Sequence, residues 1–81
     1  MKVYSTIPTE QLRMLCINNS WFTCGTNAQY EKLFYANEMG ASIDEIVTII
    51  WLCSDDTHFR RDIKSELLEA RHKFLNSLYA E

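Results

Sequence analysis

Hydrophobic side chains recur every three to four residues along most of the chain, the spacing that places them on one face of an α-helix. The only proline and both glycines fall between the segments that show this spacing. The pattern therefore predicts an all-α fold, a compact four-helix domain that spans residues 1–81. Its helices are predicted to begin at Pro8 or Thr9, at Thr26, at Ser42 and within 54–57.

The first two predicted helices have recognisable ends. Leu12, Leu15 and Cys16 share one side of the first, which is predicted to end in the polar run 18–20. The second starts with a capping box, in which the Thr26 side chain bonds the backbone N–H of Gln29 and the Gln29 side chain reaches back. Its expected buried residues are Tyr30, Leu33, Phe34 and Ala36. Gly40 follows where a left-handed residue ends a helix, because glycine has no Cβ to resist that conformation.

The third predicted helix opens with a second capping box, Ser42 to Glu45. The next six residues, 46–51, are rich in β-branched side chains that favour strands. The cap, and the grouping of the polar positions on one helical arc, favour a helix instead. Its apolar arc is wider than the roughly 100° stripe of a surface helix. We therefore expect this helix at the centre of the domain.

The fourth predicted helix carries two apolar stripes. Its main seam consists of Phe59, Ile63, Leu67, Ala70, Phe74 and Leu78. Leu68, Leu75 and Tyr79 form a second stripe, and Ile43, Val47 and Trp51 edge the apolar arc of the third helix. These six residues are the candidate protein interface, for a protein partner or for a second copy in a homodimer. Alternatively, the two stripes pack on each other within one chain.

Trp21 and Phe22 lie between the first two predicted helices. An exposed pair would mark a binding surface. A domain this small seldom leaves two large aromatic side chains outside its core. We therefore favour a plug that closes one end of the core.

The second and third predicted helices, joined at Gly40 with small Ala36 nearby, resemble in spacing a helix-turn-helix unit over roughly twenty residues. The resemblance implies nucleic-acid binding, with these groove-facing side chains: Ile43, Asp44, Val47, Thr48 and Trp51. None of them is basic, and residues 41–56 contain four acids and no Lys or Arg, which phosphates repel. A structural αα-hairpin is the favoured interpretation, and nucleic-acid binding remains the alternative function.

Composition narrows the function further. The length of 81 residues excludes large enzymes. The chain carries 8 Lys plus Arg and 11 Asp plus Glu, and the resulting net charge of -3 disfavours a phosphate-binding protein. The longest apolar run, 49–53, is far shorter than the roughly 20 residues that cross a bilayer, and no signal peptide is recognisable. The odd number of cysteines, three, fits free thiols. A cytoplasmic protein without a membrane segment is expected.

Cysteine, histidine and basic residues offer three candidate chemical sites. Cys24 precedes a helix N-terminus, which lowers a thiol pKa, but no histidine is placed beside it by the sequence. The spacings from Cys16 to Cys24 and from Cys53 to His58 match no usual zinc motif. Basic residues at 60, 61 and 64 are interleaved with acids, and a solvated helix face is favoured over an RNA or acidic-partner contact. We expect no enzyme activity, no metal and no cofactor.

The segments 21–27 and 50–54 resemble small uncharacterised proteins carried by phages and other mobile elements of Gram-positive bacteria. The resemblance spans most of residues 5–55 and implies an accessory protein without transferable functional residues. Together, these observations predict a non-enzymatic protein–protein interaction module or regulatory accessory protein.

Overall fold

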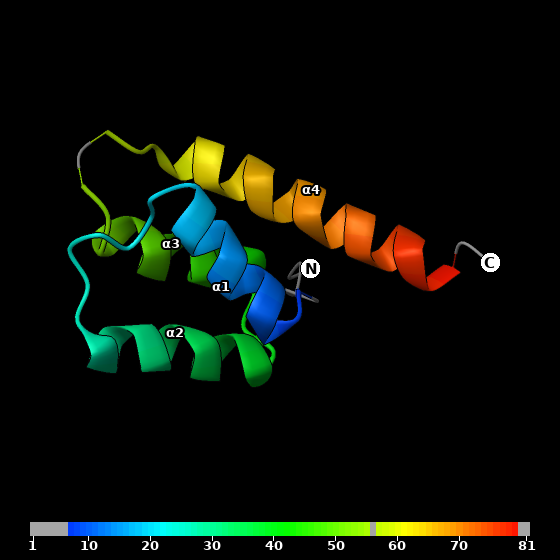
Figure 1. Ribbon diagram of the computed structural model, residues 1–81, viewed down its shortest axis with the longest axis horizontal. Helices are drawn as coiled ribbons and strands as arrows, with labels where there is room; N and C mark the ends of the chain where they lie inside the picture. Colours follow the sequence, from blue (N-terminus) through cyan, green and yellow to red (C-terminus); the bar gives the residue numbers. More distant parts are fainter. Residues whose placement is uncertain (1–6, 56, 80–81) are drawn as a thin grey trace.

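The computed structural model describes residues 7–55 and 57–79, except the side chain of Tyr79. Within them lie four helices, in the order predicted (Figure 1). Their bounds are α1 (Thr9–Asn18), α2 (Asn27–Glu38), α3 (Ile43–Leu52) and α4 (Arg60–Tyr79). The protein is therefore an all-α domain.

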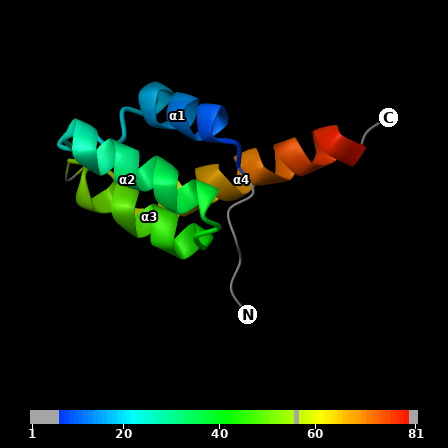
Figure 2. The ribbon, with the colours of Figure 1, turned by 90° about the horizontal axis from the view of Figure 1, so that it is seen from below.

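The helices pack in sequence, α1 on α2, α2 on α3 and α3 on α4. Helices α2 and α3 run side by side in opposite directions, as an αα-hairpin, and the second half of α4 extends beyond the other helices (Figures 1 and 2). The molecule measures 40 × 26 × 24 Å.

The predicted central helix is confirmed, because α3 buries more of its length than any other helix. Its buried residues are Ile43, Ile46, Val47 and Ile50. Leu33 of α2, Leu12 of α1 and Ile63 and Leu67 of α4 are fully enclosed around it. Of the residues expected to be buried in α2, Tyr30, Phe34 and Ala36 are only partly buried.

The start of α4 differs from the prediction, since the helix begins at Arg60 rather than within 54–57. The Asp55 carboxylate accepts hydrogen bonds from the backbone N–H and the hydroxyl of Thr57. This local turn competes with helical hydrogen bonding and delays the helix. The predicted seam is accordingly buried at Ile63 and Leu67 but exposed at Phe59 and Leu78, because Phe59 precedes the helix and Leu78 lies in its extended half.

The predicted starts of α2 and α3 are confirmed by their hydrogen bonds, the first as a full capping box and the second by the Ser42 bond. The Thr26 hydroxyl accepts from the Gln29 N–H at 3.2 Å, and the Gln29 side chain accepts from the Thr26 N–H at 2.8 Å. The Ser42 hydroxyl accepts from the Glu45 N–H at 3.2 Å. Both caps satisfy backbone donors that the first turn leaves without partners.

Helix α2 ends in a Schellman motif at Gly40. The Ala41 N–H donates to the Ala36 carbonyl at 3.0 Å, the Gly40 N–H donates to the Asn37 carbonyl at 3.2 Å, and Gly40 has a φ of 85°. These two bonds, together with a left-handed residue directly after the cap, define the motif. Gly40 is therefore the left-handed cap that the sequence predicts.

Helix α1 ends in the same motif without a glycine. The Trp21 N–H donates to the Cys16 carbonyl at 2.9 Å, and the left-handed residue is Ser20, with a φ of 56°. Phe22 is also left-handed, with a φ of 66°. Trp21 and Phe22 are both buried, which confirms the predicted plug.

Candidate interaction surfaces

The predicted protein interface is only partly on the surface. Ile43 is 1% exposed and Val47 is 4% exposed, because α4 and α2 pack over the face of α3 that carries them. In this conformation they belong to the core and are not available to a partner. For Ile43 and Val47, the structure therefore shows packing within one chain, the alternative that the sequence left open.

The remaining candidates lie at intermediate depth. Trp51 and Leu68 are half-buried and pack against the core, and Leu75 is half-buried in the extended half of α4. The side chain of Tyr79 lies outside the described residues. The six predicted residues therefore do not form one continuous exposed patch.

A groove that the sequence did not predict runs between α1 and α4. Both helices contribute residues to the core, yet their backbones do not pack on each other directly. The groove has a volume of about 390 Å³ and is open to solvent. Its lining residues are Glu10, Gln11, Met14, Leu15 and Asn18 of α1 and Glu66, Glu69, Ala70 and Lys73 of α4.

The floor of this α1–α4 groove is apolar and its rims are charged. We call its apolar lining residues, Met14, Leu15 and Ala70, the floor, and its charged lining residues the rims. Carboxylates stand on both rims, and Lys73 pairs with Glu69 at 3.2 Å on the α4 side. No single sequence signal announces such a groove, since it depends on how α1 is set against α4.

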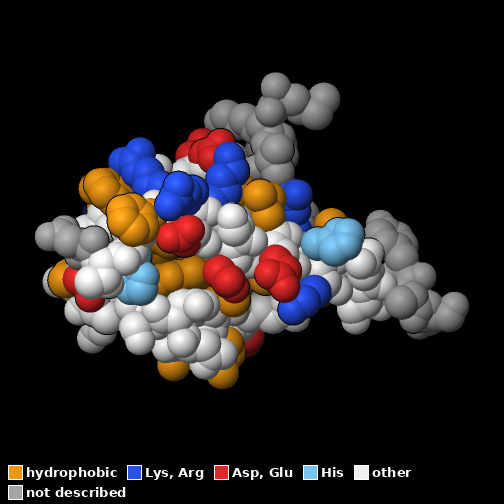
Figure 3. Space-filling model, turned by 90° about the horizontal axis from the view of Figure 1, so that it is seen from above, with side chains coloured by type: hydrophobic (Ala, Val, Ile, Leu, Met, Phe, Trp, Pro, Cys, Tyr) orange, Lys and Arg blue, Asp and Glu red, His pale blue; other side chains and the backbone are white. Residues whose placement is uncertain are grey.

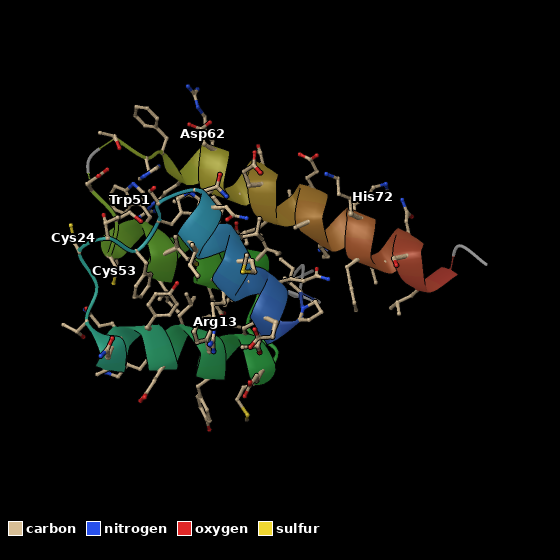
Figure 4. The ribbon with its side chains drawn as sticks, viewed as in Figure 1. Arg13, Cys24, Trp51, Cys53, Asp62 and His72 are labelled. Atoms are coloured by element: carbon tan, nitrogen blue, oxygen red, sulfur yellow. The ribbon has the colours of Figure 1, made fainter. Side chains whose placement is uncertain are left out.

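Arg13 is the one basic residue of α1, and it lies on the side of the helix that faces α2. Its guanidinium sits 5.0 Å from the centre of the Phe34 ring of α2, and Figure 4 shows it between α1 and α2. Its contact with Glu10 is long, at 3.8 Å, and both side chains are well exposed. Arg13 therefore lies beside the groove and offsets part of the charge of Glu10.

A second apolar surface lies where α3 gives way to α4. Leu52 is 66% exposed and Phe59 is 58% exposed, beside a hollow of about 300 Å³ that Trp51 and His58 also line. The Trp51 ring is held in place, because its Nε1 donates to the His58 carbonyl at 3.2 Å and the Arg60 guanidinium stacks 4.3 Å from its centre. We call this surface the α3–α4 corner.

The basic residues of α4 are largely engaged with neighbours. Lys64 pairs with Asp44 of α3 at 2.8 Å, Arg61 lies 3.8 Å from Asp62, and Arg60 covers Trp51. Figure 3 shows basic, acidic and apolar side chains interleaved on this side of the molecule. The surface has the mixed charge of a solvated helix face.

The face of α3 that remains open to solvent is acidic. Asp44 and Glu45 are exposed there, and the partly buried Thr48 turns its hydroxyl to the Asp44 carbonyl at 2.9 Å. Ile43 and Val47, expected in the DNA groove by the helix-turn-helix resemblance, are in the core. A recognition helix presents basic or amide side chains at such positions.

The cysteines do not form a reactive centre among the described residues. Burial raises the pKa of Cys16 to about 11 and raises the pKa of Cys53, so both remain thiols at neutral pH. Cys24 is exposed, and His72 lies toward the opposite end of the molecule (Figure 4). In the part of the chain that the structure describes, no cluster of His, Cys, Asp and Glu is arranged to hold a metal ion.

The chain matches no family model, no curated protein and no solved structure. Across residues 7–55 and 57–79, none of the helices combines the length and the apolar character needed to cross a bilayer.

Proposed function

We propose that this protein is a non-enzymatic interaction module that holds a helix of a protein partner in the α1–α4 groove. The observation that supports the proposal is the groove itself, an apolar floor between two helices whose backbones stay apart. A helix that enters such a groove packs its own apolar face between the two helices and adds a further helix to the bundle.

The shape of the groove favours a helix over a small molecule. Pockets for small molecules enclose most of the ligand surface, whereas this groove is open to solvent. Met14 is 51% exposed on the floor, and its flexible side chain adapts to different apolar partners. Ile17 follows Met14 by three residues, one helical turn, and adds exposed apolar surface next to the groove.

The size of the groove sets the expected strength of binding. Stable protein complexes bury about 1,200–2,000 Å² in total, and contacts smaller than this are weak and transient. A single helix in this groove belongs to the weaker class. A regulatory or accessory role, in which the partner binds and leaves, is consistent with such an interface.

Nucleic-acid binding, the alternative function, is less well supported. The solvent-exposed face of α3 is acidic, and Lys64 of α4 is already paired with Asp44. Phosphate binding gains affinity from Lys and Arg that release counterions, but of the basic residues that gather at the start of α4, Arg60 stacks on Trp51 and Lys64 pairs with Asp44.

Site-specific photo-crosslinking tests the proposal. A photoreactive phenylalanine is placed at Gln11 or Lys73, on the two rims, and at Glu31 on the exposed side of α2 as the matched control. We expect the same protein to be crosslinked from both rim positions and not from Glu31. The purified partner is then expected to bind the original chain and to lose binding when Met14→Glu places a charge on the floor.

Crosslinking to a second copy of the chain would make the partner the protein itself, as a homodimer. Equal crosslinking from Glu31 and the rims, or unchanged binding to a folded Met14→Glu variant, would contradict the proposal. Circular dichroism checks that the variant keeps its helices.

A further inference from the structure

The charges on the groove rims carry an inference about the partner, which rests on the proposed function. Glu10 lies on the α1 rim, and Glu66 and Glu69 lie on the α4 rim, against Lys73 as the one basic residue among those that line the groove. The lining therefore carries three acids and one base, a net charge of -2. We infer that the α1–α4 groove selects an amphipathic helix whose apolar stripe is flanked on both sides by Lys or Arg.

The acids are placed where they meet the flanks of a bound helix. A helix seated on Met14, Leu15 and Ala70 turns its apolar stripe to the floor, and the residues beside that stripe face the two rims. Because acids stand on both rims, each flank of the helix meets at least one carboxylate. Opposite charges across such a rim favour the correct partner, and like charges exclude the wrong one.

The cations near the groove do not cancel this charge. Lys73 pairs with Glu69 at 3.2 Å and Arg13 lies 3.8 Å from Glu10, which leaves Glu66 as the lining acid without an ion pair among the described residues. Arg13 makes only a long, exposed contact with Glu10 and stacks over Phe34 on the far side of α1. With Arg13 counted beside the lining, three acids face two bases, a net charge of -1, so the groove stays acidic.

The small side chain of Ala70 sets the depth of the seat. An alanine between Glu66 and Lys73 on α4 lets the backbone of an incoming helix approach closely, as small residues do at helix crossings. The partner is therefore expected to place its largest apolar side chains toward α1, where Met14 yields, and smaller ones toward Ala70.

Three synthetic peptides of about 15 residues provide the probes. They share one leucine and alanine stripe and differ only in the flanking residues, which are Lys, Gln or Glu. Binding to the full chain is measured by fluorescence anisotropy. We expect the Lys peptide to bind about tenfold more tightly than the Gln peptide, the Glu peptide to bind most weakly, and the difference to shrink as salt is raised.

Charge reversal in the groove tests where the preference arises. The double variant Glu10→Lys with Glu66→Lys is expected to invert the order of the three peptides. Glu31→Lys with Ala28→Lys and Tyr35→Lys, which changes the net charge equally on exposed positions of α2, is expected to keep it. Inversion by both variants would trace the preference to the overall charge and overturn the inference.

The outcomes separate this inference from the proposed function. Equal binding of the Lys and Gln peptides, lost in Met14→Glu, would leave the groove as a helix site and overturn its charge selectivity. If none of the three peptides competes with the crosslinked partner, the inference about charge is overturned. The proposed function is then still judged by the crosslinking experiment alone. Light scattering measures the molar mass of the free protein, and the mass of a dimer would show that a second copy of the chain competes with the peptides for the groove.

Discussion

Helices α1 and α2 end in the same hydrogen-bonded motif, but they reach it in different ways. At the end of α2 the left-handed residue is Gly40, and a Cβ built there meets nothing within 4 Å. At the end of α1 it is Ser20, and Phe22, two residues later, is also left-handed. The first end is therefore set by a residue that adopts the conformation without strain, and the second is imposed on residues that resist it.

The difference lies in what each connection buries. The α2–α3 connection, 39–42, turns the chain in four residues. The α1–α2 connection, 19–26, places the Trp21 and Phe22 side chains in the core. The Phe22 ring packs against Tyr30 in a tilted arrangement, with 4.7 Å between the ring centres, and the Phe22 N–H donates to the Ser54 hydroxyl at 2.9 Å. Burial and hydrogen bonds compensate the strain of two left-handed residues. A turn can thus be encoded by its own residue or by the contacts of its neighbours.

Removal of the buried side chain has the largest expected effect. Trp21→Ala is expected to lower the free energy of unfolding by about 3–5 kcal/mol, because it empties a buried site and removes the burial that offsets the strain at Ser20. Tyr35→Ala, at an exposed aromatic of α2, is the control and is expected to cost under about 0.5 kcal/mol. Urea denaturation measures both. A Trp21→Ala loss as small as the control would show that the plug does not hold this connection.

Alkaline pH is expected to destabilise the protein through two buried or partly buried groups that flank the α1–α2 connection, Cys16 of α1 and Tyr30 of α2. Burial raises the pKa of Cys16 from 9.0 to about 11, and mainly burial raises the pKa of Tyr30 from 10.0 to about 12. The unfolded chain therefore loses these protons first, and stability present below pH 9.0 falls as pH rises toward about 11. For Cys16 the loss amounts to about 2–3 kcal/mol at its limit. Cys16→Ala is expected to flatten the alkaline fall in the urea midpoint, whereas Cys24→Ser, at an exposed thiol, is expected to leave it.

Substitution of the glycine cap has a smaller effect. Gly40→Val is expected to destabilise by more than about 1 kcal/mol, since a β-branched residue is poorly tolerated at positive φ. Gly40→Asn is expected to cost less, because asparagine accepts the left-handed region. Thermal unfolding compares them. Equal melting temperatures for the valine variant and the parent protein would show that the backbone at Gly40 has an alternative that avoids the strain.

The smallest predicted change is a gain. Ser20→Gly is expected to stabilise by about 0.5 kcal/mol, the strain relieved in the folded chain less the entropy that glycine adds to the unfolded one. The same exchange in the middle of α4, Ser65→Gly, is expected to destabilise by a similar amount. Opposite signs in urea denaturation would confirm that Ser20 is strained, and equal signs would contradict it.

The two connections also explain what the sequence could predict. Thr26, Ser42 and Gly40 were recognisable because the chemistry of each cap resides in the residue itself and one or two neighbours. Ser20 carried no such signal, since its conformation depends on the burial of Trp21 by other helices. The four helices followed from spacing, whereas the start of α4 depended on a local Asp55 turn.

The candidate site was harder to predict than the fold. Helical spacing identified Ile43 and Val47 as one edge of an apolar arc, but spacing within a helix does not say which neighbour covers that edge. The α1–α4 groove depends on the separation of two helices that are far apart in sequence. Helical spacing predicts that Ala70 belongs to the core seam, and Ala70 does pack against the core. Spacing does not predict the open groove beside it.

One hydroxyl joins the α1–α2 connection to the end of α3. Ser54 donates to the Ile50 carbonyl at 2.7 Å and accepts from the Phe22 N–H at 2.9 Å, so the α1–α2 connection closes onto the end of α3. Beside it the Cys24 N–H donates to the Cys53 carbonyl at 2.8 Å. Amide hydrogen exchange at Phe22 and Cys24 is therefore expected to proceed by local opening of this seam, with α1 swinging away while the α2–α3 hairpin stays closed, whereas exchange at Ile46 requires the whole domain to unfold.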